Sequence, residues 1–398
     1  MNILRNDRKV FLGARLTKAI TIFTNARVVL PDRITPPSVL VIEDGRIASI
    51  SENPPVGVKA NIIDAKMNYL MPGFIDIHCH GDGANDFFRD VNVVAKSHLK
   101  KGTTGVLATL GYNDMQPGNL DGQVEKLWEA RDEFARQTVL GVHLEGPYVN
   151  SKYGALVRPG SLNLPVPTEY QAVLNRCSEV VRLWTLAPEL RGSEEFINSV
   201  AAKGIIMAAG HTEVDAELLG RLVPKGLRVA THWSNATGVP PPRFRGTRSA
   251  GIDEFALMTN AMTAEVICDA AGYHVPPVML NLLYRVKGAD RIIIISDAYW
   301  SVDDKNSGRE DCDVIITADG DLCGSKLCMA QSARNFMKFT GCSFPELSRM
   351  TALNPARLFG WSDDLGSLEA GKIANLVMTD DAMNVHGVWL AGSQVVRE

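Results

Sequence analysis

Two histidines, His78 and His80, stand one residue apart at the end of the apolar segment PGFIDIHCHG, residues 72–81. Side chains alternate between the two faces of a strand, so these imidazoles are expected to share one face while Cys79 takes the other. Neutral imidazole is the commonest protein ligand for zinc and its neighbours, so the pair can chelate one metal ion. Two ordinary core or surface histidines are the alternative, and the rest of the chain must decide.

Other apolar segments of strand length also end in histidines or carboxylates. They contribute His143 and Glu145 (segment 139–146), His211 (204–211), His232 (227–233) and Asp297 (291–298). Imidazole and carboxylate ligands without thiolates suit Zn²⁺, Fe²⁺, Mn²⁺ or Co²⁺. Four histidines and a carboxylate that can bridge are enough for two ions, or for one ion with spare positions. Asp297 would then be free to accept a proton from the attacking water.

The middle of the chain alternates strand-like and helix-like segments, which is typical of an α/β fold with a parallel sheet. Eight segments are expected to be strands: 69–78, 104–110, 139–146, 180–188, 204–211, 227–233, 264–270 and 291–298. Several are continuous apolar runs, as strands buried on both faces should be. Eight strands with interposed helices over about 230 residues predict a (β/α)₈ barrel, whose catalytic residues lie at the carboxyl ends of the strands.

Helical patterns fall between these strands at 93–101, 122–137, 193–203 and 276–288. An open doubly wound sheet is the alternative architecture, but the GxGxxG turn of its commonest nucleotide-binding form is missing. His98, inside the first of these helical patterns, is expected on the helix surface without a role in the chemistry. His143 is expected at most to support Glu145 from the same strand.

The two ends of the chain resemble each other and differ from the middle. Segments 19–32 and 38–50 are rich in β-branched residues and are separated by turn residues, and the C-terminal region has the same character. Chain ends commonly lie close together. We therefore expect one small β-sandwich formed by residues 1–67 and 358–398, around a barrel domain at 68–357.

Bulk properties exclude several classes of partner. A formal net charge of −4 over 398 residues argues against a nucleic-acid surface, and no apolar segment reaches transmembrane length. Seven cysteines, an odd number without a CxxC pair, favour reduced thiols and a cytoplasmic location. The basic N-terminal segment lacks the continuous apolar centre of a secretory signal. Because the net charge is small, an anionic substrate would need a cationic side chain within its own binding site.

Motifs spread along nearly the whole chain carry a resemblance to a known family. They are PGFIDIHCHG, GVHLEGPYVN, LAPE, AGHT, THWSNAT, CDAAGYHV, IIISDA and CGSKLCM. On these motifs the chain resembles the N-acetylglucosamine-6-phosphate deacetylases of the amidohydrolase superfamily. The resemblance implies a metal-bearing (β/α)₈ barrel with a small β-sandwich, hydrolysis of the N-acetyl amide of an amino-sugar phosphate, and a homodimer.

The resemblance also implies roles for individual residues. It assigns one ion to Glu145, His211 and His232, the additional ligand pair to His78 and His80, and the catalytic acid and base to Asp297. Its remaining assignments concern the substrate: Asn235, Ala236 and Arg248 near the phosphate, His274 at the sugar, and Gly324 and Ser325 in a loop that covers it. One or two divalent ions per chain, most simply Zn²⁺, are therefore expected.

Three departures from the family pattern fall in the substrate-binding loops. Leu156 stands where the family carries a histidine that polarises the acetyl carbonyl, and Arg248 is followed by Ser-Ala-Gly instead of Glu-Pro-Gly. The usual FNAM is SNAT, residues 234–237. Hydrolysis is therefore better supported than the sugar phosphate, and a second ion at His78 and His80 would compensate for the lost histidine.

Alternative functions differ in what they require of the site. N-acetylgalactosamine-6-phosphate or an N-acyl-D-amino acid would use the same metal ligands and different binding loops. A cyclic-amide hydrolase of the dihydroorotase type needs a modified lysine on the fourth strand, and the segment VVRLWTLAPE, residues 180–189, has none. A non-catalytic barrel would be expected to have lost ligands, whereas this chain keeps every one.

Overall fold

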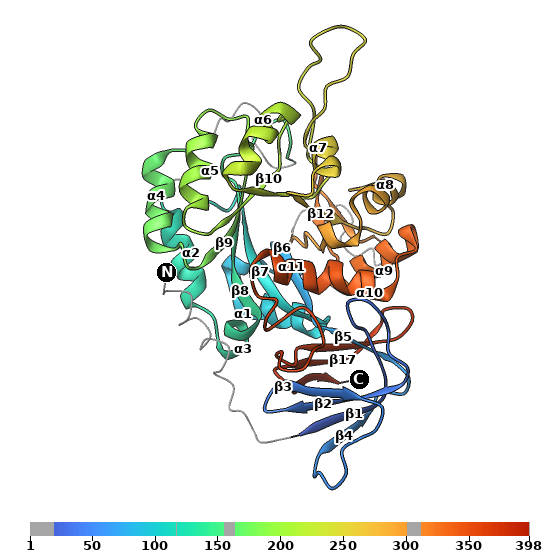
Figure 1. Ribbon diagram of the computed structural model, residues 1–398. Coiled ribbons are helices and arrows are strands. Elements are labelled where there is room, and N and C mark those ends of the chain that lie inside the picture. The colour runs from blue at the N-terminus through green and yellow to red at the C-terminus, as the bar shows by residue number, and fades with distance from the viewer. Residues whose placement is uncertain (1–19, 117, 155–163, 301–311, 398) are drawn as a thin grey trace.

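The computed structural model describes residues 20–116, 118–154, 164–300 and 312–397. Its centre is an eight-stranded parallel sheet in which each strand pairs with the next along the chain (Figure 1). The strands are β6 (Phe74–Cys79), β7 (Thr103–Gly111), β8 (Val139–Glu145), β9 (Val181–Leu186), β10 (Ile206–Ala209), β11 (Leu227–Ala230), β12 (Thr263–Ile267) and β13 (Ile292–Ile295). Seven of the eight expected strand segments are confirmed as one of these strands each, and the first, 69–78, contributes only its second half to the barrel.

The sheet closes into a barrel where β13 meets β6. The Asp297 amide donates to the His78 carbonyl oxygen at 3.0 Å, and the His80 amide donates to the Ala298 carbonyl oxygen at 2.7 Å. The predicted (β/α)₈ barrel is therefore confirmed. Because both bonds lie at the carboxyl ends of the two strands, the closure itself brings Asp297 beside the histidines of β6.

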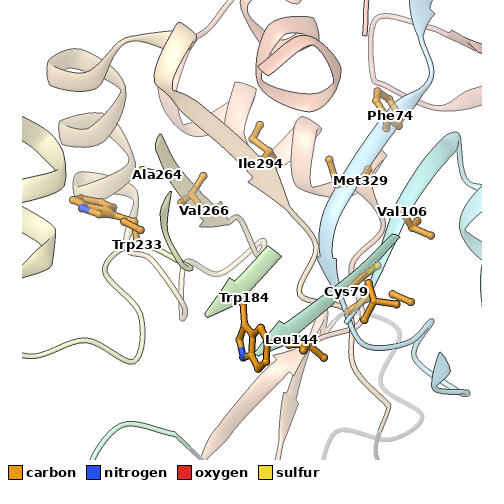
Figure 2. Close-up of a cluster of buried hydrophobic side chains, with 14 of the residues drawn as sticks. Phe74, Cys79, Val106, Leu144, Trp184, Trp233, Ala264, Val266, Ile294 and Met329 are labelled. Carbon is orange, nitrogen blue, oxygen red and sulfur yellow. The ribbon is translucent and has the colours of Figure 1, made fainter. Parts of the chain in front are cut away.

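Two apolar layers hold the barrel together. Its interior is filled by branched side chains from successive strands, among them Ile75, Ile77, Leu107, Leu183, Val229, Ile267 and Ile293. The outer layer packs between strands and helices, and Figure 2 shows part of it, including Leu144, Trp184 and Val266. Burial of this apolar surface is the main favourable contribution to folding, so the rim above it can be polar.

Helices cover the outside of the barrel. They are α1 (Phe87–Lys100), α2 (Leu120–Glu129), α3 (Glu133–Thr138), α4 (Pro167–Arg176), α5 (Ser193–Ala201), α6 (Ala216–Leu222), α7 (Ile252–Met258), α8 (Pro277–Lys287), α9 (Met329–Thr340), α10 (Phe344–Ser348) and α11 (Asn354–Leu358). A hairpin of β14 (Val314–Ile316) and β15 (Leu322–Ser325) precedes α9. No helix in the described parts of the chain is long and apolar enough to cross a membrane.

Two details of the helices differ from expectation. The single helical pattern at 122–137 forms two helices, because Asp132 has an extended backbone and its carboxylate caps α3 by accepting from the Ala135 amide at 2.9 Å. The expectation that His98 lies on a helix surface is wrong. His98 is 3% exposed, and its Nε2 lies 2.8 Å from the Gly81 carbonyl oxygen. Since that oxygen can only accept, Nε2 carries the hydrogen.

The expected first strand, 69–78, is in fact two strands in two different sheets. β5 (Tyr69–Pro72) pairs with β1 (Thr21–Val28) and β16 (Leu376–Thr379), whereas β6 pairs with β7. Gly73 separates them, and a Cβ at Gly73 would lie 2.3 Å from the Thr104 side chain. The barrel sheet therefore begins after Gly73, a few residues beyond the boundary expected at 67/68.

Both chain ends build the smaller sheet domain. β1 joins its two parts: β2 (Ser38–Glu43), β3 (Arg46–Ser51) and β4 (Asn61–Asp64) on one side, and β5, β16, β17 (Val385–Leu390) and β18 (Ser393–Arg397) on the other. In Figure 1 the blue N-terminal strands lie below the red β17. Phe23 and Trp389 meet edge to face between them, with ring centroids 4.8 Å apart. The chain ends thus form one apolar core, as the sequence indicates.

Candidate metal centre

Five side chains converge at the carboxyl end of the barrel. Glu145 at the end of β8 lies between two groups of histidines, and the ligand atoms in each group lie within 4.8 Å of one another. The two groups, both buried, are His78, His80 and Glu145, and Glu145, His211 and His232. All five ligand positions expected from the sequence are brought together.

The His211 and His232 side of the centre lacks a donor between its facing atoms. His211 Nδ1 lies 2.6 Å from the Tyr153 carbonyl oxygen, and His232 Nδ1 lies 3.0 Å from that of Asn235. Because a carbonyl oxygen only accepts, each Nδ1 carries the hydrogen, and each neutral ring presents a lone pair at Nε2. These two Nε2 atoms lie 3.1 Å apart and 3.0 and 3.1 Å from Glu145 Oε1. Three acceptors this close require a cation, and the residues present therefore fit a metal ion.

The His78 and His80 side repeats this arrangement with two differences. His78 Nδ1 lies 3.3 Å from Oε2 of Glu265, a carboxylate that is fully buried. His78 Nε2 then faces Glu145 Oε1 at 3.3 Å, and His80 Nε2 faces Glu145 Oε2 at 3.2 Å. Among the described residues, His80 Nδ1 has no hydrogen-bond partner although it is buried. A second ion fits here, with Glu145 able to bridge the two positions.

Asp297 faces this second position. Its Oδ1 lies 3.4 Å from His78 Nε2 and 3.3 Å from His80 Nε2. Burial raises the pKa of the Asp297 carboxyl, but the positive charge of His78 and the hydrogen bond from His80 outweigh burial and hold the pKa below its usual range. The carboxylate is therefore ionised at neutral pH and able to accept a proton.

The same charges act on the ligands when no ion neutralises them. Burial lowers the pKa of His80, yet hydrogen bonds to Asp297 and Glu145 outweigh it and raise the pKa to about 9. Burial raises the pKa of Glu145, and the neighbouring histidines hold it well below its usual range. In the metal-free protein, protons therefore supply the positive charge that the carboxylates need.

Backbone turns at the strand ends point these side chains inward. His211, His232 and Asp297 have φ values of 48°, 29° and 48°, in the left-handed region that non-glycine residues rarely adopt. Such conformations cluster at functional sites, where surrounding structure holds them. The two histidines of β6 are oriented in another way, because the register of the pairing between β6 and β7 shifts between Asp76 and Cys79. Ile75 and Ile77 face the barrel interior while Cys79 packs outside, as expected for Cys79.

Several residues beside the centre were not anticipated from the sequence. The ring of Tyr112 lies 5.1 Å from that of His211, and the ring of Tyr299 lies 5.1 Å from that of His80. Burial, strengthened by the nearby carboxylates, raises the pKa of both phenols, which stay protonated. Glu265 could have been found from the sequence, because it is an acidic residue inside the apolar strand β12.

His143 lies below the centre and does not face it. Its Nδ1 is 3.2 Å from the Thr109 hydroxyl and its Nε2 is 2.9 Å from the Thr185 hydroxyl. Its ring meets that of His78 edge to face, with centroids 4.6 Å apart. His143 therefore packs beneath His78, and its ring nitrogens contact two threonines instead of Glu145, the residue that it was expected to support.

Only some of the residues expected to bind the substrate line the metal pocket. Asn235, Ala236 and Gly324 line the pocket that contains the metal ligands and Asp297. His274 is buried against Asp269, and within the described residues its Nε2 has no partner. The Ser325 hydroxyl is buried and donates to the Ser296 carbonyl oxygen at 2.6 Å, which fixes the loop behind Asp297.

Arg248 lies away from this pocket within its own chain. It belongs to the loop that projects from the barrel just before α7 (Figure 1). Its side chain is 82% exposed and paired with Glu254. Leu156, in the loop after β8, lies outside the described residues.

A model of the amidohydrolase family matches residues 69–395, which covers the barrel and the C-terminal strands. The chain belongs to the amidohydrolase family. This amidohydrolase is 30% identical over 366 residues to N-acetylglucosamine-6-phosphate deacetylase of Bacillus subtilis, covering 86% of the chain and 89% of that protein. It is 28% identical over 371 residues to N-acetylgalactosamine-6-phosphate deacetylase of Escherichia coli, covering 89% and 93%.

Solved structures agree with this relationship. N-acetylglucosamine-6-phosphate deacetylase of Pasteurella multocida superposes with a TM-score of 0.82 at 26% identity, covering 95% of this amidohydrolase and all of that chain. A mutant of the Mycobacterium smegmatis enzyme, in complex with N-acetyl-D-glucosamine-6-phosphate, gives a TM-score of 0.79 at 26% identity over 95% of this chain and all of the other.

Proposed function

We propose that this amidohydrolase hydrolyses the N-acetyl amide of N-acetylglucosamine-6-phosphate, giving glucosamine-6-phosphate and acetate. One observation carries the proposal: five metal-ligand side chains converge, and four of them line one pocket together with Asp297. The chain also matches deacetylases of this substrate over most of its length. N-acetylgalactosamine-6-phosphate is the second candidate, because the E. coli relative is named for it.

The metal would be held in two positions that share Glu145. His211 and His232 would complete one position, and His78 and His80 the other. Nitrogen and oxygen ligands suit Zn²⁺, and Fe²⁺, Mn²⁺ or Co²⁺ would fit the same donors. When bound, such an ion supplies Lewis acidity, which polarises an amide carbonyl and lowers the pKa of water.

Asp297 would carry the proton in both halves of the reaction. Its ionised carboxylate accepts the proton of the attacking water, and it then delivers that proton to the amide nitrogen as the carbon–nitrogen bond breaks. Its carboxylate is ionised at neutral pH, which the first step requires. Its place beside the His78 and His80 position suits both steps.

The substrate residues would divide between the sugar and the phosphate. Asn235, Ala236 and Gly324 already line the pocket, and His274 Nε2, which has no partner among the residues that the structure describes, would bind a sugar hydroxyl. Arg248 would anchor the phosphate, since a guanidinium offers a planar, permanently charged fork to phosphate oxygens. Its projecting loop would bring it to the pocket of a second copy in a cytoplasmic homodimer.

The test is an assay of metal-loaded enzyme on three classes of substrate. These are the two N-acetyl amino-sugar 6-phosphates, the same sugars without phosphate, and N-acetyl-D-amino acids, with release of acetate as the readout. We expect the highest kcat/KM for N-acetylglucosamine-6-phosphate. Preference for an N-acetyl-D-amino acid, or indifference to the phosphate, would contradict the proposed substrate and leave an amidohydrolase of another class.

Arg248→Ala tests the phosphate anchor separately. Each charge-assisted hydrogen bond is worth about 1.5 to 3 kcal/mol, so kcat/KM should fall roughly tenfold or more on the phosphorylated sugar. The unphosphorylated sugar should be affected far less. Arg243→Ala, in the same loop, is the matched control, and equal losses on both substrates would remove Arg248 from the phosphate site.

A further inference from the structure

A second cavity of about 360 Å³ lies beside the metal pocket. Its size falls in the range of small-molecule sites, which start at roughly 300 Å³. Apolar and aromatic side chains supply much of its wall: Tyr112, Met115, Leu120, Tyr148, Leu164 and Val166. Tyr112 lines this cavity and the metal pocket alike, so the two adjoin at this residue.

The position of this cavity indicates which end of a bound substrate it would contact. It is built by the segments that follow β7 and β8, including Pro147 two residues after Glu145. Asn235 and Ala236 follow β11, which stands four strands from β7 in the closed eight-stranded barrel. The two sets of residues therefore lie on opposite sides of the metal centre. An amide whose amine half extends toward Asn235 directs its acyl half toward Tyr112.

The chemistry of the cavity suits an uncharged, mostly apolar chain. The two acidic residues at its wall, Asp121 and Glu169, disfavour an anion, and Asp121 is already paired with Arg176. Tyr148 is 1% exposed, and within the described chain its buried hydroxyl makes no hydrogen bond of normal geometry. A single polar group on an acyl chain could pair with it.

We propose that this cavity binds the acyl chain of the substrate, so that the enzyme removes N-acyl groups longer than acetyl. The inference rests on the proposed function, because it assumes that the amine half of the substrate is an amino-sugar phosphate bound next to Asn235 and Ala236. Each methylene buried in such a cavity strengthens binding roughly fourfold. Movement of the Tyr112 ring would join the cavity to the metal pocket.

The experiment compares kcat/KM of the metal-loaded enzyme on N-acetyl-, N-propionyl-, N-butyryl- and N-hexanoyl-glucosamine-6-phosphate. We expect the longer chains to be cleaved at least as efficiently as acetyl. Ala172→Phe places a ring in the cavity from α4 and should lower the hexanoyl-to-acetyl ratio at least tenfold. Gln171→Phe, exposed on the same helix and outside the cavity, should leave that ratio unchanged. Thr168→Trp, from the cavity wall, repeats the test if Ala172→Phe does not fold.

The outcomes separate this inference from the proposed function. Hydrolysis of the acetyl substrate without hydrolysis of the longer chains overturns the acyl cavity and leaves the deacetylase intact. Hydrolysis of the hexanoyl substrate with a ratio that neither cavity variant changes also overturns it, because the chain must then lie elsewhere. Absence of hydrolysis across the whole series overturns the proposed function, and the acyl assignment falls with it.

Discussion

The two halves of the metal centre share Glu145 and differ in how their histidines are held. In one half, the Nδ1 atoms of His211 and His232 both donate to backbone carbonyl oxygens. In the other, His78 has the Glu265 carboxylate at 3.3 Å, and His80 Nδ1 has no partner in the described part of the molecule. Hydrogen bonds to the far nitrogen fix the ring orientation and tautomer of a metal ligand. The first half is therefore the better organised.

This difference predicts an order of filling. The position formed by Glu145, His211 and His232 should bind its ion more tightly, because less rotational freedom is lost on binding. The position of His78 and His80 should fill second and should depend on Glu265. Asp297 contacts His78 and His80 of this second position, so the carboxylate proposed to transfer the proton lies on the more weakly organised half.

Asp297→Asn should give the largest effect. The amide keeps the size of the side chain but cannot take up a proton, so turnover should fall by about two to four orders of magnitude. Metal content should stay near that of the wild type, since all five ligands remain. Metal analysis and acetate release on one preparation check this, and a variant with full metal and full turnover would remove Asp297 from proton transfer.

His78→Gln combined with His80→Gln tests the two halves directly. We expect bound metal to fall from two ions toward one per chain under metal excess, because only the Glu145, His211 and His232 position survives. The matched variant, His211→Gln with His232→Gln, should instead lose the more tightly held ion. Wild-type protein that takes up a single ion under excess would contradict the two-position centre.

Glu265→Gln addresses the support of the weaker half alone. The glutamine keeps the shape of the side chain but weakens the hydrogen bond to His78 Nδ1, and loss of such a partner costs about 10- to 100-fold in metal affinity. Titration with Zn²⁺ should show the loss at the weaker step only. A uniform loss at both steps would mean that Glu265 stabilises the barrel and not one half of the centre.

The sequence predicts those residues of the site whose proximity follows from the order of the strands, and it misses those whose proximity depends on how the barrel closes. The five ligands and Asp297 were predicted because each ends a strand, and parallel strands bring their carboxyl ends together. Glu265 was missed because its contact with His78 spans from β12 to β6 across the closure of the barrel. No spacing in the sequence encodes that distance, although a buried acid in an apolar strand was a usable signal.

Local errors had local physical causes. Segment 69–78 has one continuous apolar pattern, but the close approach of Thr104 to Gly73 divides it between two sheets. Segment 122–137 has one helical pattern, but Asp132 begins a new helix. The segment around His98 contains the charged residues Lys96 and Lys100, as a helix surface does, whereas the ring of His98 turns toward Gly81.

The smallest expected effect concerns this buried His98, which supports the loop just after His80. Burial, the largest cause, lowers the pKa of His98 to about 4, against about 6.5 in an unfolded chain. The unfolded state therefore takes up a proton first as the pH falls, and the stability of the neutral, buried ring is lost between those two values. At about pH 5 the loss relative to about pH 7.5 should be ~2 kcal/mol. Urea unfolding of metal-free wild type and His98→Gln at both pH values measures it, and equal losses in the two proteins would show that other groups carry the acid sensitivity.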